Sequence, residues 1–397
     1  MSRHILLTFN PGSSTIKLGL FDATPEAVKR IGKGVIDLRH KPLVLNIVEG
    51  RSTAEIPLKA HVTEDLHEVI EETLDWLAHH FEVSELTAVG HRVVHGGDTF
   101  SGPVRITPEV EKAIAGFVPL APLHQPHSVR LINAIARLRP SLPQVASFDT
   151  AFHRTQPDLV RRFALPRHLF DAGIKRYGFH GLSYKYIASA LGRVAPDVAG
   201  GRIVAAHLGS GASLCALKDG QSADTSMGFS TIDGIPMATR CGALDPGVLL
   251  HLQTQAGMPL SAVEDLVYHR SGLLGLSGIS ADSRDLLASE APEAREAIAI
   301  FAFRIAREMA ALATSIGGLD ALVFTAGIGE HQPRVRAEAC AHLHWLGVKL
   351  DDAANGANAA RISAPDSRVG VFVIPTDEEQ VIADEAFGVL HMGDVYA

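Results

Sequence analysis

Two stretches of the chain place a glycine–serine turn between two apolar runs, and each turn has the composition of an anion site. The first stretch runs from Ile5 to Phe21 and the second from Ile203 to Leu217, about half of the 397-residue chain apart. Gly12-Ser13 of the first corresponds to Gly209-Ser210 of the second. Small residues at a strand-to-strand turn let backbone N–H groups approach a phosphate closely. Either turn alone also fits an ordinary glycine hairpin, but the pair, one per half, favours two lobes that bind a polyphosphate.

Three cationic side chains stand next to glycine-containing turns. Lys17 follows the first turn, where its ammonium can reach a phosphate oxygen. Arg92 ends an apolar run and precedes a Gly-Gly pair in GHRVVHGG, and Arg240 precedes a glycine in MATRCGALDPG. A solvated edge position is the alternative for Lys17. Together these cations suit an anionic substrate.

Polar residues also occur where apolar strands end or loops are stiff. Asp149 directly follows the run Gln144 to Phe148, so it is either a site residue or a helix N-cap. His124 lies between two prolines, and His180 lies between an aromatic residue and a glycine. The carboxylates of PTDEE, which include Glu378, suit Mg²⁺ or a helix start.

The segment FTAGIGEH combines an apolar strand, a glycine-rich turn and a helix start, which suits the phosphates or the ribose of a nucleotide. Motifs of rival chemistries are missing from the sequence. It has no G-x-S-x-G elbow, no H-E-x-x-H, no paired C-x-x-C and no Walker A pattern.

Short apolar runs alternate with longer amphipathic ones, which predicts an α/β fold. We expect strands at Ala88 to Val94, Gln144 to Phe148 and Ala321 to Thr325. We expect helices at Thr63 to His80, Pro108 to Phe117, Ser128 to Leu138, Ala291 to Ile316 and Glu378 to Leu390. The chain is expected to cross between domains near residue 150, and the last helix to return to the first lobe.

The bulk composition narrows the functional class. A chain of 397 residues is expected to form two domains. The net charge of −8 and the lack of a basic run with aromatic residues argue against nucleic-acid binding. Three scattered cysteines fit a reducing compartment, and no signal peptide or membrane span is evident. These features predict a cytoplasmic protein.

Ten segments, in order along nearly the whole chain, resemble the acetate kinase family, within the acetate and sugar kinase/heat-shock 70/actin superfamily. The segments are N-x-G-S-S-x-x-K at Asn10, G-H-R-V-V-H-G-G at Gly90, A-P-L-H at Ala121, F-D-T-A-F-H at Phe148, R-Y-G-x-H-G at Arg176, H-L-G-x-G at His207, D-T-S-M-G at Asp224, S-G-L-L-G at Ser271, F-T-A-G-I-G-E at Phe324 and P-T-x-E-E at Pro375.

The resemblance implies a two-lobe, duplicated, actin-like or ribonuclease H-like α/β fold with the active site in the interdomain cleft. Residues 1–150 with a C-terminal helix at about 380–397 would form the first lobe, and residues 151–379 the second. The implied reaction is reversible transfer of phosphate from ATP to acetate, giving ADP and acetyl phosphate, with Mg²⁺ and possible use of Mn²⁺. A homodimer, without nucleic-acid or membrane partners, is also implied.

The resemblance further implies roles for the matching side chains. The catalytic set is Arg92, Asp149, His180 and Arg240. The substrate-binding set is Arg92, Val94, Leu123, Phe179 and His124. The ATP-binding set is Ser13, Lys17, His207, Leu208, Gly209, Ser210, Gly211, Asp282, Ser283, Arg284, Gly327, Ile328, Gly329, Glu330 and His331. The metal set is Asn10 and Glu378. Because a carboxylate acceptor is already ionised, Asp149 is expected to hold a magnesium-bound water or orient the nucleophile rather than move a proton.

Several positions depart from the family pattern. Ser210 stands where asparagine is usual, Tyr184 where histidine is usual and Thr231 where proline is usual; Thr15, Cys241 and Ala243 also differ. The departures leave acyl specificity and efficiency open. Three alternatives remain at this stage: a propionate or other short-chain carboxylate kinase, a catalytically weak ATP-binding actin-like regulatory protein, and a sugar kinase.

Overall fold

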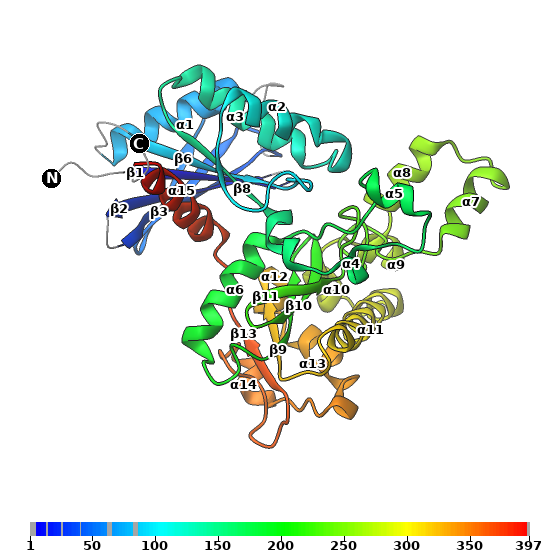
Figure 1. Ribbon diagram of the computed structural model, residues 1–397. Coiled ribbons are helices and arrows are strands. Elements are labelled where there is room, and N and C mark those ends of the chain that lie inside the picture. The colour runs from blue at the N-terminus through cyan, green and yellow to red at the C-terminus, as the bar shows by residue number, and fades with distance from the viewer. Residues whose placement is uncertain are drawn as a thin grey trace. The chain divides into compact units, whose positions relative to one another are not determined.

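The computed structural model describes residues 5–12, 15–24, 27–39, 41–61, 66–81 and 86–394. Ser13, predicted to contact the nucleotide, lies outside the described residues. Contacts divide the chain into two compact units, Met1–Phe152 with Asp377–Ala397 and His153–Thr376. Each unit has its own sheet and its own helices (Figure 1).

The first unit is built on an eight-stranded sheet with the order β5-β4-β3-β2-β1-β6-β8-β7. Strands β1 to β5 pair antiparallel, whereas β6 runs parallel to β1 and β8 runs parallel to β6. The strands are β1 (Ile5–Pro11), β2 (Thr15–Thr24), β3 (Ala27–Asp37), β4 (Val44–Glu49), β5 (Ser52–Pro57), β6 (Leu86–Val93), β7 (Val104–Arg105) and β8 (Gln144–Phe148).

Helices cover both faces of this sheet. The helices are α1 (His67–His80), α2 (Pro108–Gly116), α3 (Gln125–Leu138) and α15 (Glu378–Asp394). On β1, Ile5, Leu7 and Phe9 pack in one core with apolar side chains of α1 and α3. Leu6 points to the other face and packs with residues of α15. Figure 1 shows α15 on the opposite side of the sheet from α1 and α3.

The second unit repeats the same strand pattern in a five-stranded sheet, β11-β10-β9-β12-β13. The strands are β9 (Arg202–Leu208), β10 (Ala212–Lys218), β11 (Gln221–Thr225), β12 (Ala321–Thr325) and β13 (Gly370–Val373). As in β3-β2-β1-β6-β8, a three-stranded antiparallel ribbon is continued by two parallel strands. The hairpin turn after β1 therefore corresponds to the turn after β9, and the α/β prediction is confirmed.

The remaining elements of this unit are helical: α4 (Asp158–Arg161), α5 (Arg167–Asp171), α6 (Gly181–Val194), α7 (Pro246–Thr254), α8 (Leu260–His269), α9 (Gly272–Ser277), α10 (Ser283–Ala288), α11 (Pro292–Ser315), α12 (Ala326–His331), α13 (Pro333–Ala341) and α14 (Asp352–Gly356). The long buried helix predicted from Ala291 forms as α11, with Pro292 at its first position. It packs along β9, β10 and β11.

Helices α1, α3 and α12 differ at their starts from the sequence prediction. Helix α1 was expected from Thr63, but Leu66 is its N-cap in a left-handed conformation and the helix begins at His67. Helix α3 begins at Gln125 rather than Ser128, because Pro126 fits a first helical turn, where its missing N–H costs nothing. The glycines of FTAGIGEH do not form a separate turn; helix α12 begins at Ala326, directly after β12. None of the described helices is long and apolar enough to cross a membrane.

Candidate active site

Three parallel strands of the first unit end at a buried polar centre. Asn10 lies near the end of β1, Arg92 lies near the end of β6, and Asp149 directly follows β8. Arg92 donates from Nε and Nη2 to Asp149 Oδ2 at 3.0 and 2.7 Å, and from Nη1 to Asn10 Oδ1 at 3.0 Å. Asp149 is fully buried and the Arg92 side chain is 13% exposed. The carboxyl ends of neighbouring parallel strands thus gather the predicted side chains.

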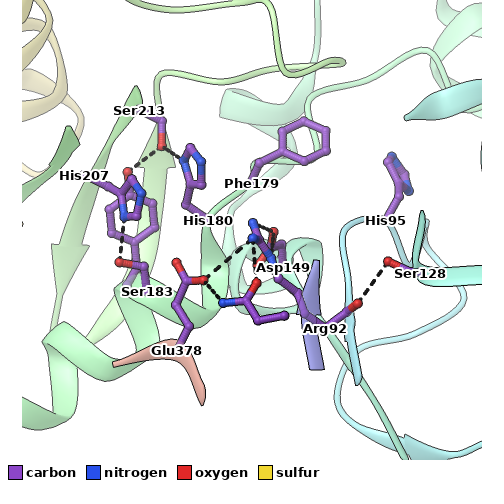
Figure 2. A network of polar contacts seen from close by, with 12 residues as sticks. Arg92, His95, Ser128, Asp149, Phe179, His180, Ser183, His207, Ser213 and Glu378 are labelled. Carbon is purple, nitrogen blue, oxygen red and sulfur yellow. Dashed lines mark hydrogen bonds and ion pairs between the residues drawn. The ribbon is translucent and has the colours of Figure 1, made fainter. Parts of the chain in front are cut away.

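The first turn of α15 completes this centre. The side-chain amide of Asn10 donates to Glu378 Oε2 and to Glu379 Oε1, both at 2.8 Å. Glu378 Oε2 also lies 3.7 Å from Arg92 Nη1. Figure 2 shows Arg92, Asp149 and Glu378 turned toward one another. The start of the helix is held by Asp377, which accepts two hydrogen bonds from Arg30.

The charge of this centre is negative overall. Burial by itself lowers the pKa of Arg92, but the carboxylates of Asp149, Glu378 and Glu379 outweigh that effect and raise it, so the guanidinium stays charged. Three carboxylates against one cation leave an excess of hard, anionic oxygen ligands, which is the donor chemistry that Mg²⁺ takes. Within the described ranges, no group of three or more His, Cys, Asp or Glu residues could hold a metal by itself. Mg²⁺ commonly uses one or two protein carboxylates together with substrate phosphates, so the residues fit.

A second set of donors meets in the second unit, at the turn between β9 and β10. A Cβ atom added to Gly211 would lie 3.6 Å from His180 Nε2, and 3.6 and 3.7 Å from Nη1 and Nη2 of Arg240. The imidazole and the guanidinium therefore converge on one point beside this glycine. Arg240 is held there by donating from Nη1 to the Thr231 carbonyl at 3.0 Å. Burial lowers the pKa of Arg240.

His180 is fixed by its backbone and by its ring. It is the N-cap of α6 in a left-handed conformation, with φ of 56°, which is unusual for a non-glycine residue. Its ring stacks on His207 with centroids 4.2 Å apart. Ser213 lies 2.8 Å from His180 Nδ1, and Ser183 lies 2.8 Å from His207 Nδ1 (Figure 2). Each imidazole thus has a serine hydroxyl at its Nδ1.

The predicted nucleotide-binding segments lie in the same unit, and two of them are linked directly. His207 is the next-to-last residue of β9 and is paired in register with Thr325, the residue before α12, so the β9–β10 turn and the start of α12 are neighbours. Gln332 donates to Ser283 Oγ at 2.7 Å, which joins the end of α12 to the start of α10. Asp282 caps α10 by accepting from the Arg284 backbone N–H. The Gly209–Gly211 turn and the segments Asp282–Arg284 and Gly327–His331 therefore belong to one region of the sheet.

Glu330, one of the predicted nucleotide-binding residues, has backbone partners within the second unit. Glu330 accepts hydrogen bonds from the backbone N–H groups of Ala326 at 2.8 Å and Thr376 at 3.2 Å, so its carboxylate caps its own helix. Arg336, which sequence analysis missed, is fully buried and donates to the carbonyls of Gly329 and Glu330. These hydrogen bonds therefore fix the position of α12, the helix that contains the glycines.

The other predicted side chains are divided between the units. In the first unit Val94 is buried, Leu123 and His124 are partly buried, and Lys17 has an exposed side chain opposite Asn10 in the hairpin register. Phe179 is buried in the second unit, where its carbonyl lies 3.0 Å from His153 Nε2. The preceding glycine, Gly178, has φ of 84°, and a Cβ there would lie 2.5 Å from the His153 ring.

Sequence analysis also assigned no role to three residues that support the site residues through hydrogen bonds, namely Glu379, Ser213 and Tyr184. Glu379 follows the predicted Glu378, and adjacent acidic residues at a helix start were the available signal. Tyr184 was marked in the sequence as a departure from the family pattern, without a role, whereas Ser213 gave no signal, because single hydroxyl residues are common and its partners lie far away in the sequence.

Comparisons with known proteins agree on one family. The model of the Acetokinase family matches residues 5–384. An acetate kinase of Rhodopseudomonas palustris is 51% identical over 96% of this chain and 96% of its own length. A propionate kinase structure from Francisella tularensis aligns with a TM-score of 0.88 at 33% identity, covering 97% of this chain and 99% of that one. A Porphyromonas gingivalis acetate kinase structure aligns with a TM-score of 0.84 at 35% identity, covering 98% and 100%.

These matches cover nearly the whole chain, and they confirm both the resemblance read from the motifs and the fold class that it implied. The chain belongs to the acetokinase family.

Proposed function

We propose that this protein transfers the γ-phosphoryl group of ATP to acetate, reversibly, giving ADP and acetyl phosphate. The observation that carries the proposal is the convergence of His180 Nε2 and the Arg240 guanidinium on one point beside Gly211. Two adjacent cationic or N–H donors are what a transferring phosphoryl group requires. The 51% identical relative from Rhodopseudomonas palustris is an acetate kinase.

The reaction needs little covalent chemistry from the protein. An acetate oxygen attacks the γ-phosphorus in line, the new O–P bond forms, and the bond to the bridging oxygen breaks so that this oxygen leaves with ADP. The transition state is loose, and its charge spreads over three equatorial oxygens. His180 and Arg240 are proposed to donate hydrogen bonds to these oxygens. An arginine in this role is typically worth about 10³ to 10⁵ in rate.

The residues of the first unit are proposed to handle the acceptor. Arg92 would hold the acetate carboxylate, and Val94 and Leu123 would line the apolar side of the acyl group. Asp149 already accepts two hydrogen bonds from Arg92. It therefore fixes the orientation of the guanidinium, and no proton transfer is required of it because acetate is ionised at neutral pH.

Magnesium would be held by Asn10 and Glu378, with Asp149 beside them. These residues supply amide and carboxylate oxygens within one buried, net negative centre. When bound with ATP, the ion neutralises phosphate charge. The tasks of this chain are to present those oxygens and to keep Asn10 oriented by Arg92 and Glu379.

Propionate is the nearest alternative acceptor, since the Francisella tularensis structure is a propionate kinase. The regulatory alternative is weaker, because an ATP-binding switch has no need of an arginine held for a carboxylate. A sugar kinase would need a base for a hydroxyl acceptor. The predicted substrate-binding residues Val94, Leu123 and Phe179 are apolar, which does not suit a sugar.

The direct test incubates purified protein with ATP, Mg²⁺, hydroxylamine and one of acetate, propionate or butyrate. Acyl phosphate reacts with hydroxylamine to a coloured hydroxamate, and we expect the highest kcat/KM with acetate. A higher kcat/KM with propionate would change the proposed acceptor but leave the proposed phosphoryl transfer unchanged. No hydroxamate from any of the three acids would reject the enzymatic function.

We also propose that the chain forms a homodimer through the surface around α7 of the second unit. Helix α7 has the sequence PGVLLHLQT, yet none of its residues is buried. Val248 is 41% exposed and Leu250 62% exposed, and Leu260 on α8 is 69% exposed. Exposed apolar residues gathered in this way are typical of a protein interface. Light scattering should give a dimer mass for the wild type and a monomer mass for Leu250→Glu; a wild-type monomer would exclude the dimer.

A further inference from the structure

A buried chain of hydroxyl groups leads to the imidazole of His180. Ser213 Oγ on β10 lies 2.8 Å from His180 Nδ1 and 2.6 Å from the phenolic oxygen of Tyr184 on α6. Ser213 and Tyr184 are both fully buried. Tyr184 stands where the family resemblance places a histidine, and no role in the reaction was predicted for it.

The chemistry of the three groups sets the direction of these hydrogen bonds. A serine hydroxyl has a single proton to donate. A phenol, with a pKa near 10, is a stronger acid than an aliphatic alcohol, and a neutral imidazole nitrogen is the stronger base. The favoured arrangement pairs the strongest acid with the strongest base along the chain. Tyr184 therefore donates its proton to Ser213, and Ser213 donates its proton to His180 Nδ1. In a neutral ring whose Nδ1 accepts, the hydrogen is on Nε2.

The stacked ring of His207 is held in the opposite sense. Ser183 donates its hydroxyl proton to Thr376 Oγ1 at 2.9 Å, so the hydrogen between Ser183 and His207 comes from His207 Nδ1. His207 Nε2 is then an acceptor. The two parallel imidazoles thus differ: one presents a donor at Nε2 and the other an acceptor.

We propose that Tyr184 is a positioning residue that, through Ser213, holds His180 as the Nε2–H tautomer, with this N–H directed at the point beside Gly211. A neutral Nε2–H can donate to a phosphoryl oxygen without prior protonation of the ring. The use of that N–H in the reaction rests on the proposed function. The tautomer itself is a property of the resting protein and is measured without turnover.

The first experiment is a two-bond ¹H–¹⁵N correlation spectrum of protein labelled at histidine, recorded at pH 7.5. The His180 signals are assigned by their loss in His180→Gln. We expect a pyrrole-like Nε2 and a pyridine-like Nδ1 for His180, and the reverse for His207. In Tyr184→Phe, Ser213 is released to donate or accept, so the His180 signals should shift toward a mixture of tautomers. An Nδ1–H tautomer in the wild type, or an unchanged single tautomer in Tyr184→Phe, would overturn the proposal.

The second experiment compares the kinetics of Tyr184→Phe with those of Tyr186→Phe. Tyr186 lies on the same helix and is partly exposed, so its variant makes the same chemical change away from His180. We expect kcat to fall roughly three- to tenfold in Tyr184→Phe, as for one lost hydrogen bond, with the KM values for ATP and acetate within twofold. Tyr186→Phe should match the wild type. An unchanged kcat in Tyr184→Phe contradicts the positioning role.

The tautomer measurement and the hydroxamate assay together distinguish a failure of this inference from a failure of the proposed function. If His180 has the expected tautomer but no acid yields hydroxamate, the proposed function fails and the tautomer assignment stands. If hydroxamate forms and the tautomer is Nδ1–H, the function stands and the role of Tyr184 fails.

Discussion

Depth and partners decide what an arginine can do in this protein. Arg92 is buried among carboxylates, which raise its pKa and keep it charged for a carboxylate or phosphate. Arg336 is buried among carbonyl and amide oxygens, and burial lowers its pKa to about 10. Arg284 is 80% exposed and pairs with Asp282 in solvent, where such a pair contributes little to stability. Of these three, Arg92 is the one that is buried among carboxylates, which agrees with the role proposed for it.

Asp149→Asn tests the proposed task of the buried carboxylate. The amide keeps the shape of the carboxylate and can still contact Arg92, but it removes one negative charge from the proposed magnesium site. We expect the Mg²⁺ concentration at half-maximal rate to rise roughly 10- to 100-fold, while the pH profile keeps its shape. Hydroxamate assays over Mg²⁺ and pH series check this. A normal magnesium response with a displaced pH profile would show that Asp149 transfers a proton.

Gly211→Ala tests the convergence of His180 and Arg240. The added methyl group meets its neighbours at 3.6 to 3.7 Å, an ordinary contact distance, so the protein should fold with an unchanged Tm. The methyl would nevertheless occupy the point on which both donors converge. Losing donors to the transferring group should lower kcat roughly 10²- to 10³-fold. Gly192→Ala on α6, where a Cβ meets nothing within 4 Å, is the matched control; equal activity in both variants would contradict the site.

At the residue scale, the sequence indicates which polar residues stand at the ends of strands. It gives much less information about residues whose role depends on a contact with another side chain or with the backbone. Asp149 and Arg92 are predictable because the ends of parallel strands meet at one edge of a sheet. Glu330 follows glycines in a phosphate-type motif, yet its carboxylate is used by backbone N–H groups, which no motif records. Tyr184 is linked to His180 through Ser213, which is 29 residues from Tyr184 in the sequence, so its role depends on the fold.

At the scale of elements, local pattern predicts some of the strands, whereas β3, β4, β5, β7 and β11 were not among those expected. Strands β8 and β12 have the predicted bounds because each is a short apolar run between turn residues. The matching order of the two five-stranded cores depends on pairing between strands distant in sequence, as between β9 and β12. The contribution of α15 to the first unit likewise depends on packing, through Ala383 and Ala386 against Leu6 and Ala88.

Gly90→Ala tests how the docking of α15 supports the polar centre. A Cβ on Gly90 would lie 2.7 Å from Ile382 Cγ2 and 3.3 Å from the Ile382 carbonyl, so the helix must move off β6. We expect a loss of about 1–3 kcal/mol in the free energy of unfolding, as for overpacking. Hydrogen exchange should also speed up in α15.

The control for this variant lies on the same helix. Gly388→Ala adds a methyl group that meets nothing within 4 Å, and alanine favours helix over glycine. It should keep or raise the stability. Slow exchange in α15 of Gly90→Ala would show that the helix is not held by this contact.

At the scale of the whole molecule, the two units share a strand order but differ in the charges that they bury. The first unit buries an arginine–carboxylate centre together with His91 and His95, whereas the second buries Arg336 among neutral oxygen atoms together with His153. Burial lowers the pKa of each of these three histidines to about 4. They are therefore neutral in the folded chain at pH values where an unfolded chain already takes up protons.

The stability of the protein should consequently fall as the pH drops from 6.5 toward 4. In this window the unfolded state binds more protons than the folded state, so unfolding becomes easier with each step down in pH. At pH 5.5 each of these three histidines should cost roughly 1 kcal/mol of the free energy of unfolding. Urea unfolding at pH 7.5 and 5.5 measures the effect.

Two variants provide the control. His91→Gln cannot titrate and keeps a hydrogen-bonding group for Gln144, so it should weaken the pH dependence of stability. His79→Gln, on the exposed end of α1, should leave that pH dependence unchanged. Equal urea midpoints at the two pH values would mean that these buried rings take up protons in the folded protein as readily as in the unfolded one.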